Sequence, residues 1–319
     1  MIEIFYFDGA VKKANVHDLE KVKAWPIWID VTNITKKEAE VLRVAFDLHP
    51  LTVEDMLQAN SRIKVEEFSQ YVYCVFYGVE KRHDVHKGRP IGLVEIDFAL
   101  GERFLISSHI GEIASFNELK NNTVMLEQLF RKSVDFIMHR LLDHEVDNYF
   151  PVLQSIDDQI EEIEEEVTKR PQHTLLARIL SIKRTIVIVK KVALPQREKI
   201  SVIAKTASRF VSKKAMPYYR DVHDHAVRVA DLIDNYRENI GNTFDVYMSA
   251  VSNTTNEVMK VLSVMATLAL PLTVISSIYG ANFAILPGAE NPLGFWIMIG
   301  FMAIVSSGML LFFRSRHWF

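Results

Sequence analysis

The sequence predicts an α+β membrane protein in which an N-terminal α/β domain is followed by a helical hairpin and then by a very long helix. That helix continues into the first of two transmembrane helices. Three observations predict this order: strand and helix signals alternate up to about residue 125, the pattern then becomes helical, and two uncharged runs follow. The runs extend from Val261 to Ala289 and from Asn291 to Phe313. Each is long enough for the roughly 20 helical residues that cross a hydrocarbon core.

Composition excludes several classes of protein. The chain has 319 residues and a net charge of −3, so no basic excess indicates a nucleic-acid partner. Its single cysteine, Cys74, rules out an intrachain disulfide framework, and we expect a reduced, buried thiol. The sequence has no P-loop, no dinucleotide-binding glycine pattern and no nucleophile motif. We therefore expect neither an enzyme nor a small organic substrate.

The N-terminal domain is expected to contain a sheet of mixed order and short helices. Thr35-x-x-Glu38 predicts a capping box that opens a helix ending near Phe46. Thr52 is a candidate N-cap for a second short helix. Gly101-Glu102 predicts a hairpin turn. Five segments have the β-branched and aromatic composition of strands: Ile2–Phe7, Ile27–Val31, Tyr71–Tyr77, Leu93–Leu100 and Arg103–Ser107.

Two helices of opposite charge are expected next. Ile160–Glu166 carries a dense acidic face, and Pro171 ends its helix because the residue before a proline avoids helical geometry. A basic helix is predicted from about Thr174 to Leu194, where Pro195 would end it. The pair suits an antiparallel hairpin. Its charges fit either two solvated faces or a specific ion-binding role.

A single helix is predicted from Pro217 to Tyr279. Proline suits a first helical position, and Gly241 is the only glycine between Tyr218 and Leu270. At 1.5 Å per residue this helix would be about 95 Å long, so part of it must lie outside the bilayer. Parallel copies stabilise a helix of that length, and we therefore expect an oligomer.

Flanking charges predict the orientation in the membrane. The N-terminus lacks the basic segment and long apolar core of a secretory signal, so we expect the first 260 residues to remain in the cytoplasm. Lys260, Arg314 and Arg316 flank the runs, whereas the connecting loop carries Glu290 and neither Lys nor Arg. Positive-inside bias then puts both termini in the cytoplasm. The expected parts are an α/β domain (1–125), a helical hairpin region (126–215), a stalk helix (216–260), two transmembrane helices (261–280 and 292–313), an extracytoplasmic loop between them (281–291) and a basic tail (314–319).

One face of the long helix is suited to line a pore. Its residues, spaced three or four apart, are small and polar at both ends and apolar in the middle. In a symmetric bundle this face would give polar mouths and an apolar constriction that gates by excluding water. Small residues also mark ordinary contacts between membrane helices, so that alternative stays open. The face contains Asp245, Ser249, Ser252, Asn256, Met259, Leu262, Ala266, Leu270, Thr273 and Ser277, and it leads to Gly280.

Tyr279-Gly280-Ala281-Asn282-Phe283 resembles the Tyr-Gly-Met-Asn-Phe signature of the CorA family of divalent metal ion (magnesium/cobalt) transporters. Two further stretches, His49–Asp55 and Tyr219–His225, are similar to other family motifs, so the resemblance covers nearly the whole chain. It implies a funnel-shaped homopentamer that is embedded in the lipid bilayer of the cell inner membrane. The first transmembrane helices would line the pore, and the second helices would surround them.

The resemblance also implies a selectivity filter formed by Gly280, Ala281 and Asn282. A ring of Asn282 amides would hold hydrated Mg²⁺ through its waters, because Mg²⁺ dehydrates reluctantly. Asp245 would lie in the inner vestibule, with Met259 and Leu262 at the constriction. Ala281 departs from the family methionine, and the lost packing is expected to affect selectivity and conduction.

In the family, cytosolic carboxylates of neighbouring subunits bind regulatory Mg²⁺, and loss of that ion favours opening. The matching positions are Asp55 and Asp221, with Glu54, Asp143 and His225 as candidates for a second site. Taken alone, Asp55 and Asp221 would more often be ordinary surface acids. Carboxylates suit Mg²⁺, and His225 also admits Co²⁺, Ni²⁺ or Zn²⁺.

The resemblance thus implies a channel-like transporter that moves hydrated Mg²⁺, with Co²⁺ and Ni²⁺ as further candidates, into the cytoplasm. A potential of 100 mV would drive two charges with about 4.6 kcal/mol. Two alternatives stay open. One is a Zn²⁺ transporter of the same superfamily, coupled to protons. The other is a non-conducting, membrane-anchored metal-sensing subunit in which Ala281 has disabled the pore.

Overall fold

The computed structural model describes residues 1–58, 61–81, 91–169, 171–205, 209–281, 287, 291–316 and 318. The chain divides into two compact units. The first unit comprises Met1–Glu166 and Gln172–Phe244, and the second comprises Val167–Pro171 and Asp245–Phe319.

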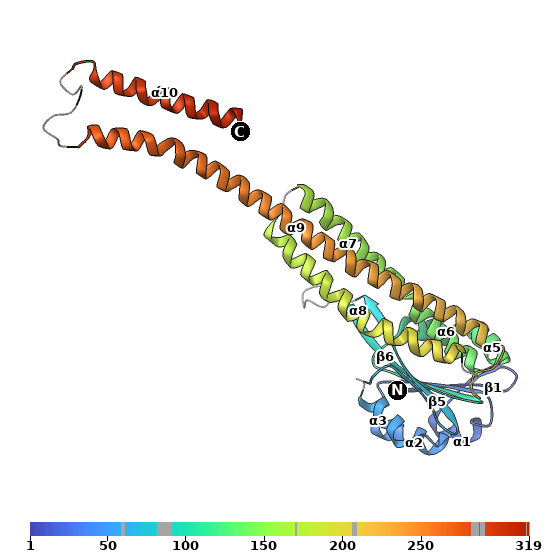
Figure 1. Ribbon diagram of the computed structural model, residues 1–319. Helices are drawn as coiled ribbons and strands as arrows, with labels where there is room; N and C mark the ends of the chain where they lie inside the picture. The colour runs from blue at the N-terminus through green and yellow to red at the C-terminus, as the bar shows by residue number, and fades with distance from the viewer. Residues whose placement is uncertain are drawn as a thin grey trace. The chain divides into compact units, whose positions relative to one another are not determined.

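The first unit contains a seven-stranded sheet with the order β2-β1-β3-β7-β6-β5-β4 (Figure 1). β3 and β7 are parallel, and the other neighbouring strands are antiparallel. The predicted mixed order is therefore confirmed. The strands are β1 (Ile2–Phe7), β2 (Val11–Ala14), β3 (Ile27–Thr32), β4 (Lys64–Glu67), β5 (Tyr71–Lys81), β6 (Ile91–Gly101) and β7 (Phe104–His109).

All five predicted strands are present, and the predicted turn at Gly101-Glu102 joins β6 to its antiparallel neighbour β7. β2 and β4, the two edge strands of the sheet, were not predicted. Both are four residues long and rich in Lys or Glu. Short, charged edge strands lack the apolar pattern on which strand prediction depends, although the charge protects the edge from pairing with other chains.

Helices cover both faces of the sheet (Figure 1). On one face, α1 (Leu19–Val22), α2 (Lys36–Phe46) and α3 (Pro50–Gln58) follow the short 3-10 helix η1 (Val16–Asp18), and Met56 of α3 packs with Tyr73 of β5. The other face packs against α4 (Ala114–Asn121), α5 (Thr123–Lys132) and α6 (Val134–Asp147). Cys74 lies in this second core, free and fully buried, as predicted.

The start of α2 confirms the predicted capping box, and the start of α3 corrects a prediction. The Thr35 hydroxyl accepts from the Glu38 backbone, and the Glu38 carboxylate accepts from the Thr35 backbone at 2.9 Å. Thr52, by contrast, is not an N-cap: it lies inside α3, where its buried hydroxyl is 2.7 Å from the Tyr71 hydroxyl. The His49 ring instead accepts from the Leu51 backbone at 3.2 Å, so His49 caps the helix.

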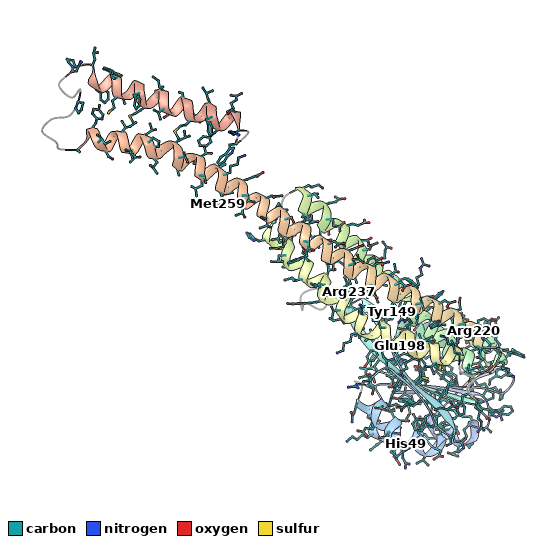
Figure 2. The ribbon with its side chains drawn as sticks, viewed as in Figure 1. His49, Tyr149, Glu198, Arg220, Arg237 and Met259 are labelled. Atoms are coloured by element: carbon teal, nitrogen blue, oxygen red, sulfur yellow. The ribbon has the colours of Figure 1, made fainter. Side chains whose placement is uncertain are left out.

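Long helices complete the first unit: α7 (Tyr149–Lys169) up to Glu166, α8 (His173–Lys205), and the part of α9 (Met216–Tyr279) that ends at Phe244. The predicted α7–α8 hairpin is confirmed, because Arg178 of α8 binds Glu162 and Glu166 of α7 at 2.5 and 2.6 Å. Tyr149, labelled in Figure 2, ties α7 to the sheet by donating its hydroxyl to the Tyr77 carbonyl at 2.8 Å.

The predicted end of the basic helix at Pro195 is wrong, because α8 continues through this proline. Proline removes one backbone hydrogen bond from a helix interior. Packing compensates here: Gln196 accepts from the Tyr77 backbone at 2.9 Å, and Ile200 and Ile203 are buried against the sheet. Tertiary contacts that follow the proline thus hold this part of the helix in place.

The second unit contains the C-terminal part of α9, beginning at Asp245, and α10 (Gly294–Ser315), which lie side by side (Figure 1). α9 begins within one residue of its predicted start, and Tyr279 is its last residue, as predicted. Both helices are long and apolar enough to cross a membrane, and their apolar windows are only 6% and 0% buried. The core helix of a soluble protein would be mostly buried, so the exposure supports two membrane spans.

Candidate functional site

Two aspartates and a histidine form a cluster in the first unit that could hold a metal ion. Asp143 and Asp147 lie one turn apart on α6, and His225 lies on α9. Their potential ligand atoms all lie within 4.8 Å of one another. His225 Nδ1 is 2.8 Å from Asp147 Oδ1 and 4.0 Å from Asp143 Oδ1. We call these three residues the α6–α9 cluster.

Packing between α6 and α9 positions this cluster. Tyr219 is fully buried one and a half turns before His225, and its hydroxyl donates to the Asp135 carbonyl of α6 at 2.9 Å. Val222 and Ala226 of α9 belong to the same buried core as Leu142 and Val146 of α6. The two helices therefore meet through apolar residues, and the cluster lies beside that contact.

Burial and like charge make the cluster a favourable place for a cation. Burial raises the pKa of Asp143, and the neighbouring Asp147 carboxylate raises it further. Burial also lowers the pKa of His139, one turn before Asp143 on α6, which disfavours a compensating imidazolium there. A divalent cation would relieve the repulsion between the two carboxylates. Two carboxylates and one imidazole suit Mg²⁺ and also the borderline ions Co²⁺, Ni²⁺ and Zn²⁺.

The structure thus brings together two of the five predicted regulatory residues, Asp143 and His225. Asp147 was missed, although its four-residue spacing from Asp143 matches the spacing of Asp221 and His225 and could have indicated it. Asp221 is exposed on α9, one turn before His225, and is not part of the cluster.

Asp55 and Glu54 lie elsewhere, on α3, and both have partners within the protomer. The Asp55 carboxylate binds the Lys64 ammonium at 2.5 Å and accepts from the Ser61 hydroxyl at 3.4 Å. Glu54 accepts from the Gln58 amide at 2.9 Å. A metal ion at Asp55 would therefore compete with Lys64.

The second candidate site is one face of α9 in the second unit. Val264 is 2% exposed, and Leu268, Pro271 and Ile275 are partly sheltered. These residues are spaced four, three and four apart, so they form one stripe on the helix. α10 runs beside this part of α9 (Figure 1), and its buried residue is Phe313. The sheltered stripe is therefore the side of α9 that faces α10.

The predicted pore residues of this segment fall on the opposite side of the helix. At 100° per residue, Leu262, Ala266 and Thr273 lie within about 20° of the direction opposite Val264. Leu262 and Leu270 are 58% and 65% exposed, and Met259, labelled in Figure 2, is also exposed. All ten predicted pore-lining residues are exposed in the single chain: Asp245, Ser249, Ser252, Asn256, Met259, Leu262, Ala266, Leu270, Thr273 and Ser277.

Hydroxyl groups on this face are satisfied by their own helix. Thr273 donates to the Ala269 carbonyl at 2.8 Å, and Ser249 donates to the Asp245 carbonyl at 2.9 Å. Such back-bonding lets a polar side chain enter a membrane without a partner from another helix.

The helix ends at the predicted selectivity filter. The Gly280 backbone donates to the Ser276 carbonyl at 2.8 Å, and a Cβ atom at Gly280 would lie 3.2 Å from that same oxygen. Glycine thus allows the last turn to close tightly. The Ala281 backbone is 3.3 Å from the Ile278 carbonyl. Asn282 and Glu290, two residues of the predicted filter and loop, lie outside the described residues.

Comparisons with known proteins identify the family to which the chain is similar. A sequence profile described as "CorA-like Mg2+ transporter protein" matches residues 24–315. The chain is 34% identical over 298 residues to the cobalt/magnesium transport protein CorA of Thermotoga maritima, which covers 92% of this chain and 83% of that protein. It is 21% identical over 314 residues to the cobalt/magnesium transport protein CorA of Methanocaldococcus jannaschii, covering 98% and 97% of the two chains.

Among solved structures, the complete structure of the CorA magnesium transporter from Methanocaldococcus jannaschii matches with a TM-score of 0.87 at 20% identity. The match covers 100% of this chain and 99% of that chain. The predicted fold class, in which an α/β domain precedes a very long helix and two membrane spans, is thereby confirmed.

Proposed function

The chain belongs to the family of CorA-like Mg²⁺ transporters, and we propose that it passes hydrated Mg²⁺ through a pore lined by α9 from five copies. It is a divalent cation transporter of that family, and the named relative in Thermotoga maritima is a cobalt/magnesium transport protein. Co²⁺ and Ni²⁺ are the further candidate ions.

The observation that carries this proposal is the orientation of α9 relative to α10. If the side of α9 that faces away from α10 lay against lipid, small and polar residues there would not stabilise the helix. In a ring of five copies, that side would face the axis, with Met259 and Leu262 as the apolar constriction and Thr273 near the outer mouth. Asp245 would attract cations at the inner vestibule, and Gly280, Ala281 and Asn282 would form the filter.

The orientation of the chain follows from its charges. Lys260 and Arg314 flank the two spans on the same side, so both termini would lie in the cytoplasm of the inner membrane. The membrane potential, negative inside, would then drive Mg²⁺ inward.

Regulation would depend on cytosolic metal. Asp55 and Asp221 of neighbouring copies would hold one Mg²⁺, with Glu54 nearby, and the α6–α9 cluster would hold a second ion. Because α9 carries His225 and continues into the pore-lining segment, an ion bound at the cluster can bias the helix that forms the pore. Loss of these ions would remove the bridges and favour opening.

A second candidate function is Zn²⁺ transport. The imidazole of His225 in the α6–α9 cluster favours it, because imidazole suits borderline metals better than it suits Mg²⁺. Proton coupling would distinguish Zn²⁺ transport from Mg²⁺ transport, because a pH gradient would then change the Zn²⁺ flux.

Ion flux into liposomes, with and without a pH gradient, tests these functions. We expect Mg²⁺ uptake under an inside-negative potential, and an altered ion preference when Ala281→Met restores the family side chain. Zn²⁺ uptake that needs the pH gradient would favour the second candidate. If Mg²⁺ flux appears only in Ala281→Met, the chain with Ala281 does not conduct and the non-conducting alternative holds.

A further inference from the structure

The N-terminal domain contains a cavity that the proposed transport does not use. It has a volume of about 180 Å³ and lies between the sheet and α3. Met56 and Leu57 of α3 form one wall. Glu95 and Asp97 of β6 and Ser108 of β7 line the opposite side.

Strand geometry places these three polar side chains on the same face of the sheet. Glu95 and Asp97 are two residues apart on β6, so both project from the same face of the sheet. Asp97 is paired directly with Ser108 in the antiparallel register of β6 and β7. Side chains that are opposite each other in such a pair share a face. Three oxygen-bearing groups therefore meet on the face that α3 covers.

All three groups are almost completely buried, and two of them keep unused hydrogen-bonding capacity. Asp97 is 3% exposed, Ser108 is 2% exposed and Glu95 is 8% exposed. Glu95 accepts from the Ser61 backbone and from the Tyr77 hydroxyl, and Asp97 Oδ1 accepts from the Tyr73 hydroxyl at 2.7 Å. No described residue forms a hydrogen bond with the Ser108 hydroxyl or with Asp97 Oδ2.

Neither oxygen belongs to the fully occluded, unpartnered side-chain atoms of the described residues, so both remain accessible from the cavity that they line. A ligand in the cavity can therefore supply the hydrogen bonds or coordination that the protein does not. The Lys64 ammonium offsets the negative charge at Asp97 only in part, because it is engaged by Asp55 at 2.5 Å and by Glu66 at 3.2 Å. Burial, together with the Glu95 and Asp55 charges, raises the pKa of Asp97 to about 7. The cavity thus holds open oxygen ligands, and above about pH 7 an ionised Asp97 lies beside Glu95 without a described counter-ion among the residues that line it.

We propose that this cavity binds a Mg²⁺ ion that keeps part of its water shell, with Asp97 and the Ser108 hydroxyl as the protein ligands and Glu95 as an outer carboxylate. The volume leaves room for several waters, each of which occupies about 30 Å³ in the liquid. Mg²⁺ is bound in this manner, through one or two carboxylates and retained waters. Ca²⁺ would require more protein oxygens than the cavity offers.

The donor set also separates this site from the α6–α9 cluster. His109 lines the cavity, but its Nδ1 lies 2.7 Å from the Gly111 carbonyl and its Nε2 lies 3.4 Å from Asp30. Its ring nitrogens are therefore already engaged. With oxygen ligands only, the cavity selects a hard ion, whereas the cluster offers an imidazole to Ni²⁺ or Co²⁺. The cavity site is complete within one protomer and does not depend on a pentamer.

Counting bound Mn²⁺ per chain tests the proposal, because Mn²⁺ takes the same carboxylate and water ligands as Mg²⁺. Full-length protein in detergent is dialysed against Mn²⁺ at pH 8, and bound ions are counted by electron paramagnetic resonance, with Mg²⁺ as the competitor. Asp97→Asn keeps the size of the side chain and the acceptor for Tyr73, and it should bind one ion fewer per chain.

Ser108→Ala removes only a hydroxyl, and it should lower the affinity of the cavity for Mn²⁺ several-fold. The matched control is Asp224→Asn, whose carboxylate is 79% exposed and belongs neither to the cavity lining nor to the α6–α9 cluster, so it should leave the Mn²⁺ count unchanged. An equal Mn²⁺ count and affinity in wild type, Asp97→Asn and Ser108→Ala would overturn the proposal. If Asp97→Asn fails to fold, the affinity of Ser108→Ala decides alone. Because the readout is binding and not flux, the result does not depend on whether the chain transports Mg²⁺.

Discussion

His225 Nδ1 on α9 lies 2.8 Å from the Asp147 carboxylate on α6, so a potential metal ligand joins two helices that are far apart in the sequence. Asp147→Asn removes one charged ligand from the α6–α9 cluster. We expect at least tenfold weaker Ni²⁺ binding, which corresponds to about 1.4 kcal/mol. Isothermal titration calorimetry of the full-length protein with Ni²⁺ would measure the affinity of the variant and of the wild type.

The matched control for that experiment is Asp224→Asn. Asp224 precedes His225 on the same helix, and its carboxylate is 79% exposed, so this variant changes the net charge equally without touching the cluster. Equal Ni²⁺ affinity in the two variants would contradict the assignment.

The capping box at α2 predicts a loss of stability in Thr35→Ala. This variant removes the hydroxyl that accepts from the Glu38 backbone. N-cap substitutions of this kind cost about 1 kcal/mol. We expect a lower unfolding temperature by scanning fluorimetry, whereas Thr35→Ser, which keeps the hydroxyl, should match the wild type. A comparable loss in both variants would indicate that the methyl group, and not the cap, matters.

Local features such as this cap were predictable because they depend on residues three or four apart. The same holds for the strands rich in β-branched and aromatic residues. Pro195 and Thr52 show where such reasoning fails: the local sequence indicates a helix end or a cap, and contacts with Tyr77 or Tyr71 on the distant strand β5 decide otherwise. Long-range packing overrides local preference at both positions.

The candidate sites were predictable to different degrees. The stripe on α9 follows from helical periodicity within one segment. The α6–α9 cluster needs the packing of two helices. The spacing of Asp143 and Asp147 places both on one face of α6, but only the fold shows that His225 lies beside them. The cavity beside Asp97 needs the register of β6 and β7, which a single strand does not reveal.

Asp97 should make stability depend on pH. Burial raises its pKa from 3.8 to about 7, so the folded protein binds this proton more tightly than the unfolded chain does. The resulting stabilisation is complete below about pH 4 and is lost as the pH rises to about 7, with a total of up to ~4 kcal/mol.

Asp97→Asn cannot titrate at this position. In metal-free buffer, the unfolding temperature of the wild type should therefore fall relative to Asp97→Asn between pH 5 and 7.5, and the difference should be constant above that range. A difference that does not change with pH would show that Asp97 keeps an ordinary pKa.

The proposed constriction predicts faster flux when Leu262 becomes polar. Leu262→Ser lowers the cost of wetting an apolar gate, and we expect several-fold faster Mg²⁺ uptake into liposomes. Met265→Ser is the matched control, because Met265 is similarly exposed, at 63%, but lies about a quarter turn from the proposed pore face. Equal gains from both variants would argue for nonspecific loosening of the bundle.

If the face of α9 opposite α10 lines the ion path, a thiol placed there by Thr273→Cys should control the flux. Cys74 provides a silent background, because it is fully buried and burial raises the pKa of its thiol. Mg²⁺ flux into liposomes is measured before and after treatment with a charged, membrane-impermeant thiol reagent. We predict that the reagent blocks flux in Thr273→Cys and leaves the wild type unaffected. Unchanged flux in Thr273→Cys, with labelling of the new thiol verified by mass spectrometry, would contradict the account.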